Sequence, residues 1–402
     1  MKASTSFRLC RFALILAICA INISSPAQDS RKSEKTLISS RTLPPLFNGK
    51  NLDGWIIRGG KATYEYEDEQ TIVGTVTTKG GGNTFLCTRK DYADFLLELE
   101  VKADERLNSG IQIRSLYFEE PRTYQFGPRE IKVAAQRVHG YQVEVDQNKN
   151  RRWSGGIYEE ARRLWLFPLP TNSPAGQAFK FGDWNHYRIR CVGPSIKTWV
   201  NGVPAADLLD AETLRGFIGL QVHSSDDVGA QVRFRNVRLH ELGEHAWQTA
   251  WDCQSFDGMD RLGLGSWQLE DGIAHGRHSA NDAQPATLQG RMTLTEFTIR
   301  FQYKLVKGGF DLAFSADTEV PSPAAYSFRF NDQNGASTKM NEWNVATLMV
   351  QGKRAALNIN GHQVQDTEND AFPRGVLPAL VLAGSQEADV YWKDFEILLP
   401  IQ

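Results

Sequence analysis

The sequence lacks several features that would quickly assign a function class. Its five cysteines in 402 residues are too few and too scattered for a disulfide framework or a metal cluster. Lys and Arg number 45 against 47 for Asp and Glu, without a long run of one sign, so nucleic acid is not an expected partner. A phosphate loop, a dinucleotide fingerprint, an HExxH motif and a GxSxG motif are also missing. These absences exclude the common nucleotide-dependent, zinc-protease and serine-hydrolase signatures.

One hydrophobic run stands out, and it lies at the N-terminus. Basic residues precede an apolar stretch over 12–21, and small residues follow it. This pattern predicts a signal peptide over 1–27, removed before Gln28. The run is too short for a confident membrane span. The mature chain is therefore expected to lack an integral membrane span and to be secreted or periplasmic; a lipoprotein attached through Cys19 is the less favoured alternative.

The remainder of the chain reads as β-structure. Residues 28–43 are polar and pattern-free, which is typical of a flexible tether. From 44 to 242, short runs of alternating apolar and polar residues recur between Gly, Asn and Asp turns. Asn201-Gly202, directly after IKTWV, is a strong hairpin signal. Many short strands with such turns predict an antiparallel sandwich or jelly roll.

A second segment, 246–402, repeats the landmarks of the first. Trp184-Asn185 is matched by Trp343-Asn344, and the Asn201-Gly202 turn recurs as Asn360-Gly361 at the same spacing. The sequence therefore predicts an all-β chain with two β-sandwiches in tandem, joined near 240–247.

Three strands of the first segment alternate in a way that gathers polar groups on one face. In GYQVEVD, Tyr141 and Val143 would enter the core and leave Glu144 on the other face. The polar side chains expected on that face are Asn108, Gln112 and Arg114, then Gln142, Glu144 and Asp146, and finally Gln221 and His223. An ordinary solvated strand face is the alternative, but this mixture of amide, acid and base suits a binding site better.

The second segment keeps the core pattern but not the polar row. By alignment of the motifs, the expected replacements are Ala313 for Arg114, Ser327 for Gln142, Arg329 for Glu144, Leu380 for Gln221 and Leu382 for His223. A site restricted to the first segment explains this difference.

Glu144 and Asp146 are the main candidates for chemistry. Two strand steps separate them, so their Cβ atoms should lie about 7 Å apart on one face. With His223 nearby, the pair suits acid–base catalysis or a divalent cation. Simpler roles stay open: Asp146 as a turn residue, His223 as a strand-end histidine, and Arg114 as a structural partner of Glu144.

Aromatic residues are concentrated between two of these strands. Trp153, Tyr158, Trp165 and Phe167 lie in a segment punctuated by Gly and Pro. Their rings could form a platform for a sugar, and Trp153 and Trp165 are the candidates for substrate binding. The alternative is that they pack the loop onto the sandwich.

The order of motifs resembles a known family. LFNGKNLDGW, NSGIQIR, GYQVEVD, GGIY, DWNHYRI, VNGV, GFIGLQVHS and VRFRNVRL occur in sequence between about 44 and 242. Together they resemble the 3-keto-disaccharide hydrolase family, a large bacterial group. The resemblance implies a concanavalin-like jelly roll, an exported protein and action on 3-keto glycosides or related sugars. It also maps the family site onto Arg114, Gln142, Glu144, Asp146 and His223.

We therefore expect a glycoside-cleaving enzyme in 44–242 and a degenerate, laminin-G-like or carbohydrate-binding sandwich in 246–402. The expected partner is a carbohydrate, and no cofactor is required by the pattern, although a divalent cation could serve. The rival hypothesis is a lectin-like protein that binds glycan without cleaving it. A laminarinase-like glycanase is ranked last, because EVDQNK supplies only the first two acids of its ExDxxE signature.

Overall fold

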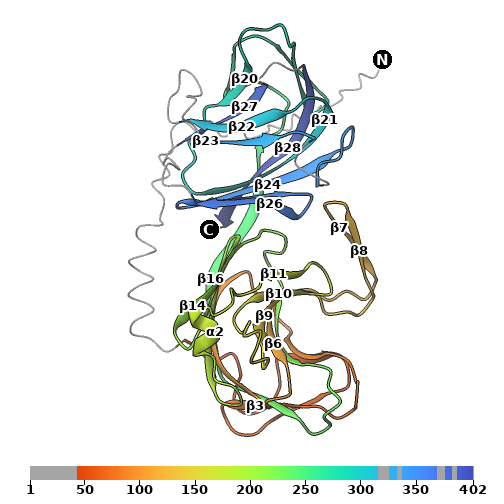
Figure 1. Cartoon of the computed structure of the whole chain (residues 1–402), viewed down its shortest axis with the longest axis vertical. Coiled ribbons are helices and arrows are strands. Elements are labelled where there is room, and N and C mark those ends of the chain that lie inside the picture. Colours follow the sequence, from red (N-terminus) through yellow and green to blue (C-terminus); the bar gives the residue numbers. More distant parts are fainter. Residues whose placement is uncertain (1–42, 316–325, 333–336, 369–375, 383–386, 402) are drawn as a thin grey trace, which may run out of the picture. The chain divides into compact units, whose positions relative to one another are not determined.

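The computed structural model describes residues 43–315, 326–332, 337–368, 376–382 and 387–401 (Figure 1). The predicted signal peptide, and the predicted tether up to residue 42, lie outside the described residues. In the part that is described, no helix combines the length and apolar character needed to cross a bilayer.

Two facing sheets form the first half of the fold. The first sheet has seven antiparallel strands, which in spatial order are β1 (Trp55–Gly59), β4 (Thr84–Thr88), β15 (Phe217–Val222), β6 (Ser109–Ser115), β9 (Gly140–Val145), β10 (Ile157–Glu160) and β11 (Leu164–Phe167). The second contains, in order, β14 (Val203–Leu209), β13 (Ser195–Val200), β12 (Asn185–Val192), β5 (Asp94–Ala103) and β16 (Gln231–Trp251), with β3 (Thr71–Thr75) and β2 (Thr63–Tyr66) beside β16.

Two smaller elements complete this half. A separate hairpin consists of β7 (Arg122–Phe126) and β8 (Arg129–Val133). A short helix, α2 (Pro174–Ala178), begins after Ser173, whose Oγ accepts a hydrogen bond from Gly176 N.

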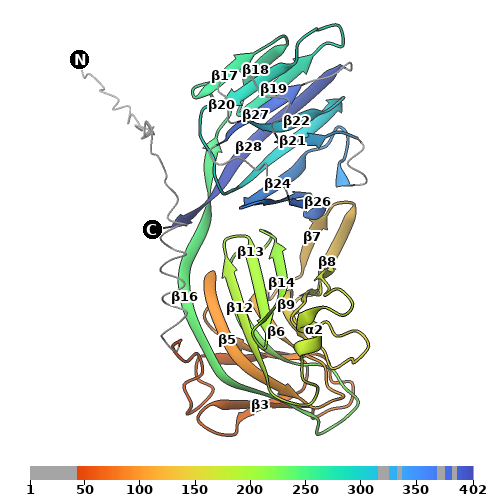
Figure 2. The same ribbon diagram turned by 60° about the vertical axis from the view of Figure 1, so that its left-hand side comes forward.

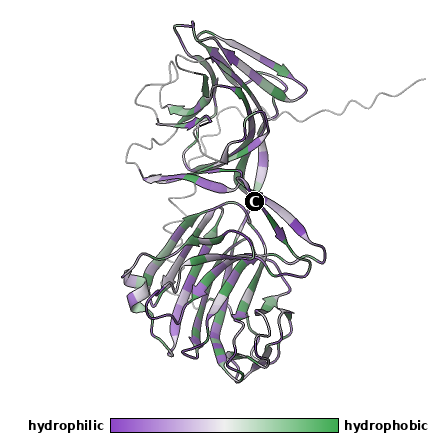
Figure 3. Cartoon of the chain, turned by 45° about the vertical axis from the view of Figure 1, so that its right-hand side comes forward, coloured by the Kyte–Doolittle hydropathy of each residue, from purple (hydrophilic) through white to green (hydrophobic). Residues whose placement is uncertain are grey.

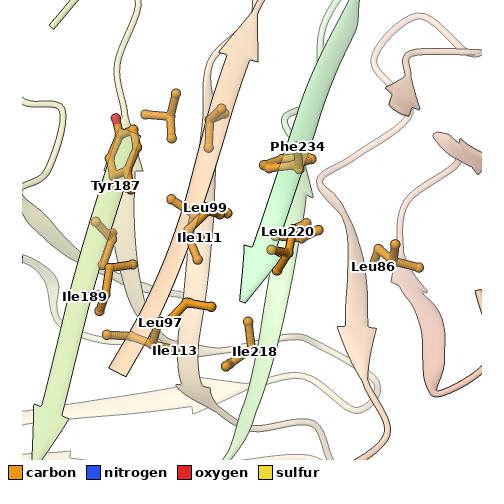
Figure 4. Close-up of a cluster of buried hydrophobic side chains, with 14 of the residues drawn as sticks. Leu86, Leu97, Leu99, Ile111, Ile113, Tyr187, Ile189, Ile218, Leu220 and Phe234 are labelled. Atoms are coloured by element: carbon orange, nitrogen blue, oxygen red, sulfur yellow. The ribbon is translucent and has the colours of Figure 1, made fainter. Parts of the chain in front are cut away.

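Alternating side chains build the core between these sheets. Ile111 and Ile113 on β6 and Leu220 on β15 are fully buried against Leu97 and Leu99 on β5 (Figure 4). Successive strand residues point to opposite faces, so the polar residues between them must lie on the outer face of the seven-stranded sheet. The same alternation follows the strands as green and purple segments in Figure 3.

The second half repeats the strand order of the first, but among the described residues its smaller sheet has no counterpart of β10 and β11. Its five-stranded sheet has the order β17 (Met259–Leu262), β20 (Ala286–Gly290), β27 (Leu377–Leu382), β22 (Phe310–Ser315) and β23 (Tyr326–Phe330). The facing strands are β26 (His362–Glu368), β25 (Arg354–Ile359), β24 (Asn344–Gln351), β21 (Phe297–Lys307) and β28 (Ala388–Ile401), with β19 (Ile273–His278) and β18 (Ser266–Glu270) beside β28.

The same pair of hydrogen bonds to an asparagine side chain occurs at equivalent positions in the two halves. Asn185 Oδ1 accepts a hydrogen bond from Lys180 N at 2.7 Å and another from Asn201 Nδ2 at 2.9 Å. In the second half, Asn344 Oδ1 accepts from Lys339 N at 2.8 Å and from Asn360 Nδ2 at 3.0 Å. The all-β, antiparallel fold class is confirmed, and the repeated motifs occupy equivalent places.

The predicted join near 240–247 lies inside one long strand (Figure 2). β16 pairs with β5 as far as Gly243, and from Glu244 onward it pairs with β28. The larger sheets of the two halves are therefore continuous through β16. The two hydrophobic cores are separate clusters: β16 contributes Phe234 and Leu239 to the first and Trp251 to the second.

Candidate functional site

A chain of side-chain hydrogen bonds links β6 to β9 on the outer face of the seven-stranded sheet. Ser115 Oγ donates to Gln112 Oε1 at 2.6 Å, and Gln112 Nε2 donates to Gln142 Oε1 at 2.7 Å. Gln142 Nε2 then donates to Glu144 Oε2 at 3.1 Å. All four side chains are buried. The predicted polar row thus forms an ordered network, and its members are shielded from solvent.

Gly110 makes room for this network. It pairs with Glu144 across β6 and β9, and a Cβ added to it would lie 2.4 Å from Gln142 Cδ. A side chain at this position would displace the Gln142 amide, which lies over the glycine backbone. Glycine at 110 therefore positions the hydrogen-bond partner of Glu144.

Glu144 has the electrostatic surroundings of a general acid or base. The residue is 4 % exposed, and burial raises the pKa of its carboxyl from 4.5 to about 7. Hydrogen bonds from Asn108 Nδ2, at 2.7 Å, and from Gln142 lower this pKa, while the charge of Asp146 raises it. The guanidinium of Arg151, with Nη2 at 3.4 Å from Oε1, also lowers it. A carboxyl with a pKa near neutrality can both accept and donate a proton there.

Asp146 organises the loop that follows β9. Its Oδ1 accepts hydrogen bonds from Asn148 N and Arg151 Nη2, both at 3.0 Å. Its Oδ2 accepts from Arg151 Nε at 2.9 Å and from Trp153 N at 3.0 Å. These contacts match the turn role that the sequence left open. The carboxylate is a positioning group for Arg151 rather than a free base.

Arg151 is the residue that sequence reasoning missed. Its side chain is about one-third exposed and bridges Asp146 and Glu144. The Asp146 carboxylate is the main reason that the pKa of Arg151 rises further above its usual value. The available signal was the basic pair Arg151-Arg152 directly after EVDQNKN, which begins five residues beyond Asp146.

Two tryptophan rings flank this guanidinium, and a tyrosine ring packs against one of them. Its carbon lies 5.0 Å from the Trp153 ring centre and 5.4 Å from that of Trp165. The two tryptophan rings are 4.5 Å apart, and Tyr158 lies 5.2 Å from Trp165. Tyr158 is opposite Gln142 across β9 and β10, so it shares the outer face. The predicted aromatic platform and the polar network are thus one cluster, connected through Arg151.

Arg114 is not part of that cluster, and the expectation that it shares the face of Gln112 is wrong. β6 carries an extra residue opposite β15, where Phe217 pairs with Ser115 but Gly219 pairs with Gln112. This bulge, with φ of +45° at Arg114, breaks the alternation of faces. The side chain instead bonds Ala93 O, Gly193 O and Asp94 Oδ1 beside the opposite sheet.

Gln221 and His223 lie on the outer face but outside the hydrogen-bond chain. Gln221 is fully buried, and neither of its amide atoms has a hydrogen-bond partner among the described residues. His223, half-buried after the end of β15, donates from Nδ1 to Ser224 O at 2.7 Å in the tautomer that a carbonyl partner requires. The neutral ring then offers Nε2 as an acceptor. Within the described part of the chain, His223 makes no hydrogen bond to Glu144.

Strand register corrects three of the equivalences drawn between the two halves. Leu220 pairs with Ile111 and Leu86, and Leu380 pairs with Leu312 and Leu288. Leu380 therefore matches Leu220, and Leu382 likewise faces the second core. The outer-face positions expected for Gln112, Gln142, Glu144 and Gln221 are held by Ala313, Ser327, Arg329 and Val381. Ala313, Ala379 and Val381 form a buried apolar cluster, so the second half still lacks the polar network.

A cation site is not apparent in the donor set. The described residues contain no group of three or more His, Cys, Asp and Glu side chains placed to hold a metal. Both oxygens of Asp146, the acid considered for this role, are already engaged by backbone N–H groups and Arg151.

Comparison with known proteins gives a family match for the first half. Residues 43–240 match the family model described as the 3-keto-alpha-glucoside-1,2-lyase-like domain. No curated protein matches the chain.

Several solved structures are similar to part of the chain. A Parabacteroides distasonis protein, provisionally assigned as a glycosyl hydrolase, is 21 % identical with a TM-score of 0.34, and the match covers 50 % of this chain and all of that one. The Bacillus subtilis carbohydrate-binding module CBM66 is 16 % identical with a TM-score of 0.29, over 49 % of this chain and all of the module. A galectin-like Bacillus subtilis protein of unknown function is 11 % identical with a TM-score of 0.33, over 47 % and 90 %. Similarity at this level carries no inference about function.

Proposed function

Because residues 43–240 belong to the 3-keto-alpha-glucoside-1,2-lyase-like family, we propose that this protein is an exported enzyme that cleaves 3-keto glycosides. The observation that carries the proposal is the buried Glu144 carboxyl, with a pKa of about 7, in contact with Asn108, Gln142 and Arg151. The aromatic platform of Trp153, Tyr158 and Trp165 beside it supports a sugar ligand. The family name supports a carbohydrate substrate.

A 3-keto sugar permits elimination in place of direct displacement. The ketone acidifies the proton on C2, and a base removes it to give an enolate with negative charge on O3. The enolate then expels the C1 substituent: the C1–O bond breaks, and its electron pair goes to the leaving oxygen, which takes a proton. Water adds across the resulting double bond, with hydroxyl at C1 and hydrogen at C2. The sum is hydrolysis to the 3-keto sugar and a free alcohol.

We assign the base role to Glu144. In the deprotonated form it can accept the C2 proton, and in the protonated form it can return one to the leaving oxygen. A pKa near 7 keeps both forms accessible at neutral pH. His223, whose neutral ring offers Nε2, is the second candidate for the proton donor or base.

We assign the electrostatic role to Arg151, because Arg114 lies outside the cluster. A fixed guanidinium beside the base stabilises negative charge as it develops on O3. Asp146 holds that guanidinium through two hydrogen bonds, and the tryptophan rings restrict it further. Gln112, Gln142 and Asn108 then keep the Glu144 carboxyl in place.

Glu144→Gln tests this proposal against the lectin-like alternative. We expect turnover of a neutral 3-keto glycoside to fall at least about a hundredfold, as for a lost general acid–base group, while binding persists. His223→Ala should produce a loss of similar size. Sugar binding by the wild type without turnover of any 3-keto glycoside would instead support a lectin. Full activity in both variants would exclude this site as the catalytic centre.

A further inference from the structure

Two polar side chains on the same sheet face as Glu144, Gln221 and Arg58, have no side-chain hydrogen bond or ion pair among the described residues. Strand register connects them: Arg58 on β1 pairs with Phe85 on β4, and Phe85 pairs with Gln221 on β15. Leu220 pairs with Ile111 on β6, so the next position places Gln221 opposite Gly110, which itself pairs with Glu144. These residues form one line across five neighbouring strands.

The spacing along this line suits an extended ligand. Neighbouring strands lie about 4.8 Å apart, so Gln221 is about 10 Å from Glu144 and Arg58 about 19 Å from it, measured along the sheet. The first interval is the reach of a disaccharide. A sugar with its C2 at Glu144 would extend its next unit toward Gln221 and Arg58.

Gln221 differs from the other amides of this face. The side chains of Gln112 and Gln142 bond each other and Glu144. Among the described residues, neither the Oε1 nor the Nε2 of the buried Gln221 has a partner. A buried amide in this state is unfavourable unless a ligand or ordered water provides both a donor and an acceptor. Adjacent hydroxyls of a sugar ring provide both.

Arg58 is a cation without a carboxylate. It is half-buried, with its guanidinium carbon 4.2 Å from the Tyr117 ring centre and 5.0 Å from that of Phe217. The described residues place no carboxylate within ion-pair distance of it. In contrast, Arg137 is paired with Glu160, the last residue of β10. Ring contacts hold the guanidinium in one place and leave its N–H donors available for an oxyanion.

We propose that Gln221 and Arg58 form a second subsite that binds an acidic unit of the substrate and makes the enzyme selective for anionic glycosides. Gln221 would bond hydroxyls of that unit, and Arg58 would bind its carboxylate or sulfate. This inference rests on the proposed function only for the placement of the cleaved sugar at Glu144.

Binding to the Glu144→Gln variant tests the subsite without requiring turnover. Calorimetric titrations would use a neutral disaccharide, its uronic-acid counterpart and its sulfated counterpart. We expect at least one acidic ligand to bind about tenfold or more tighter than the neutral one, as for a charge-assisted bidentate contact. The acidic disaccharide that binds more tightly shows whether the subsite prefers a carboxylate or a sulfate.

Second substitutions in that background assign the preference to its residues. Arg58→Gln should remove the preference for the acidic ligand, whereas Arg58→Lys should retain part of it. Arg89→Gln removes an exposed arginine beyond β4 and should retain all of it, which controls for net charge. Gln221→Leu should weaken neutral and acidic ligands by a similar factor.

The inference fails if acidic and neutral disaccharides bind equally, or if Arg58→Gln folds normally and keeps the preference. If Arg58→Gln unfolds, the Arg58→Lys titration decides. A preference for the acidic ligand as large as that with Arg58 would reject the bidentate contact. Turnover of a neutral 3-keto glycoside without any acidic preference would reject the subsite and leave the proposed function intact.

Discussion

Arg114 Nη2 lies 2.9 Å from Asp94 Oδ1 in a fully buried ion pair that links the two sheets of the first half. Asp94 Oδ2 also contacts His245 Nδ1 at 2.5 Å, and its Oδ1 accepts from Gly193 N at 3.0 Å. This pair is part of the framework beneath the candidate site, and no member of it touches Glu144 within the described residues.

Asp94→Leu should therefore reduce stability without affecting the chemistry. Removing one partner leaves the Arg114 charge buried and uncompensated, which costs about 3–5 kcal/mol. Chemical denaturation should show this loss, and activity per folded molecule should be unchanged. Glu241→Gln is the control: it breaks an exposed pair with Lys90 and should cost no more than about 1 kcal/mol. If Asp94→Leu is as stable as the wild type but inactive, the conclusion that Arg114 lies outside the catalytic site is wrong.

Arg151→Gln should lower kcat by about a hundredfold or more, the usual cost of losing one group that stabilises a developing oxyanion. The neighbouring Arg152 provides a matched control, because its side chain bonds Lys149 O and Gly176 O and lies over Phe181. Arg152→Gln should leave kcat within a few-fold of the wild type. Equal effects of the two substitutions would contradict the role of Arg151.

The fold follows from the sequence because alternation and turn residues are local properties. The polar row on β9 was predictable for the same reason: Gln142 and Glu144 lie where period two places them. Arg114 was not, since a one-residue bulge reverses its face and only the paired strand reveals it. Leu380 and Leu382 were placed on the wrong face because motif alignment leaves a one-residue ambiguity that only strand register removes. Arg151 could not be placed because it lies on a loop whose course depends on Asp146.

Glu144 should also make stability depend on pH. Its folded pKa is about 7, above the ordinary 4.5, so the folded state binds more protons than the unfolded state between these values. The contribution of Glu144 to the free energy of unfolding is fully present below pH 4.5. It should decline by about 3 kcal/mol as the pH rises through 7. Chemical denaturation at several values between pH 5 and pH 8 gives the free energy of unfolding of the wild type and of Glu144→Gln. The difference between the two should change in favour of the variant as the pH rises. A constant difference would contradict the raised pKa.

The second half should have no glycosidase activity of its own. Arg329 occupies the position of Glu144 and pairs with Asp311 at 2.9 Å, and Val381 occupies that of Gln221. A chain truncated after Trp247 retains every β16–β5 pair and the His245–Asp94 contact. We expect this chain to fold and to cleave 3-keto glycosides, and residues 246–402 alone to be inactive. Activity in 246–402, measured with the same substrate, would place a catalytic site outside the polar network.

The most direct test of elimination at Glu144 compares a 3-keto glycoside with its parent alcohol in deuterated water. Only the ketone acidifies the C2 proton, so we expect the 3-keto substrate to react far faster and to acquire deuterium at C2. Both the rate advantage and the exchange should be lost in Glu144→Gln. Nuclear magnetic resonance of the product gives the label directly. Equal rates on both substrates, with hydrogen retained at C2, would contradict elimination and indicate direct displacement by an ordinary glycosidase.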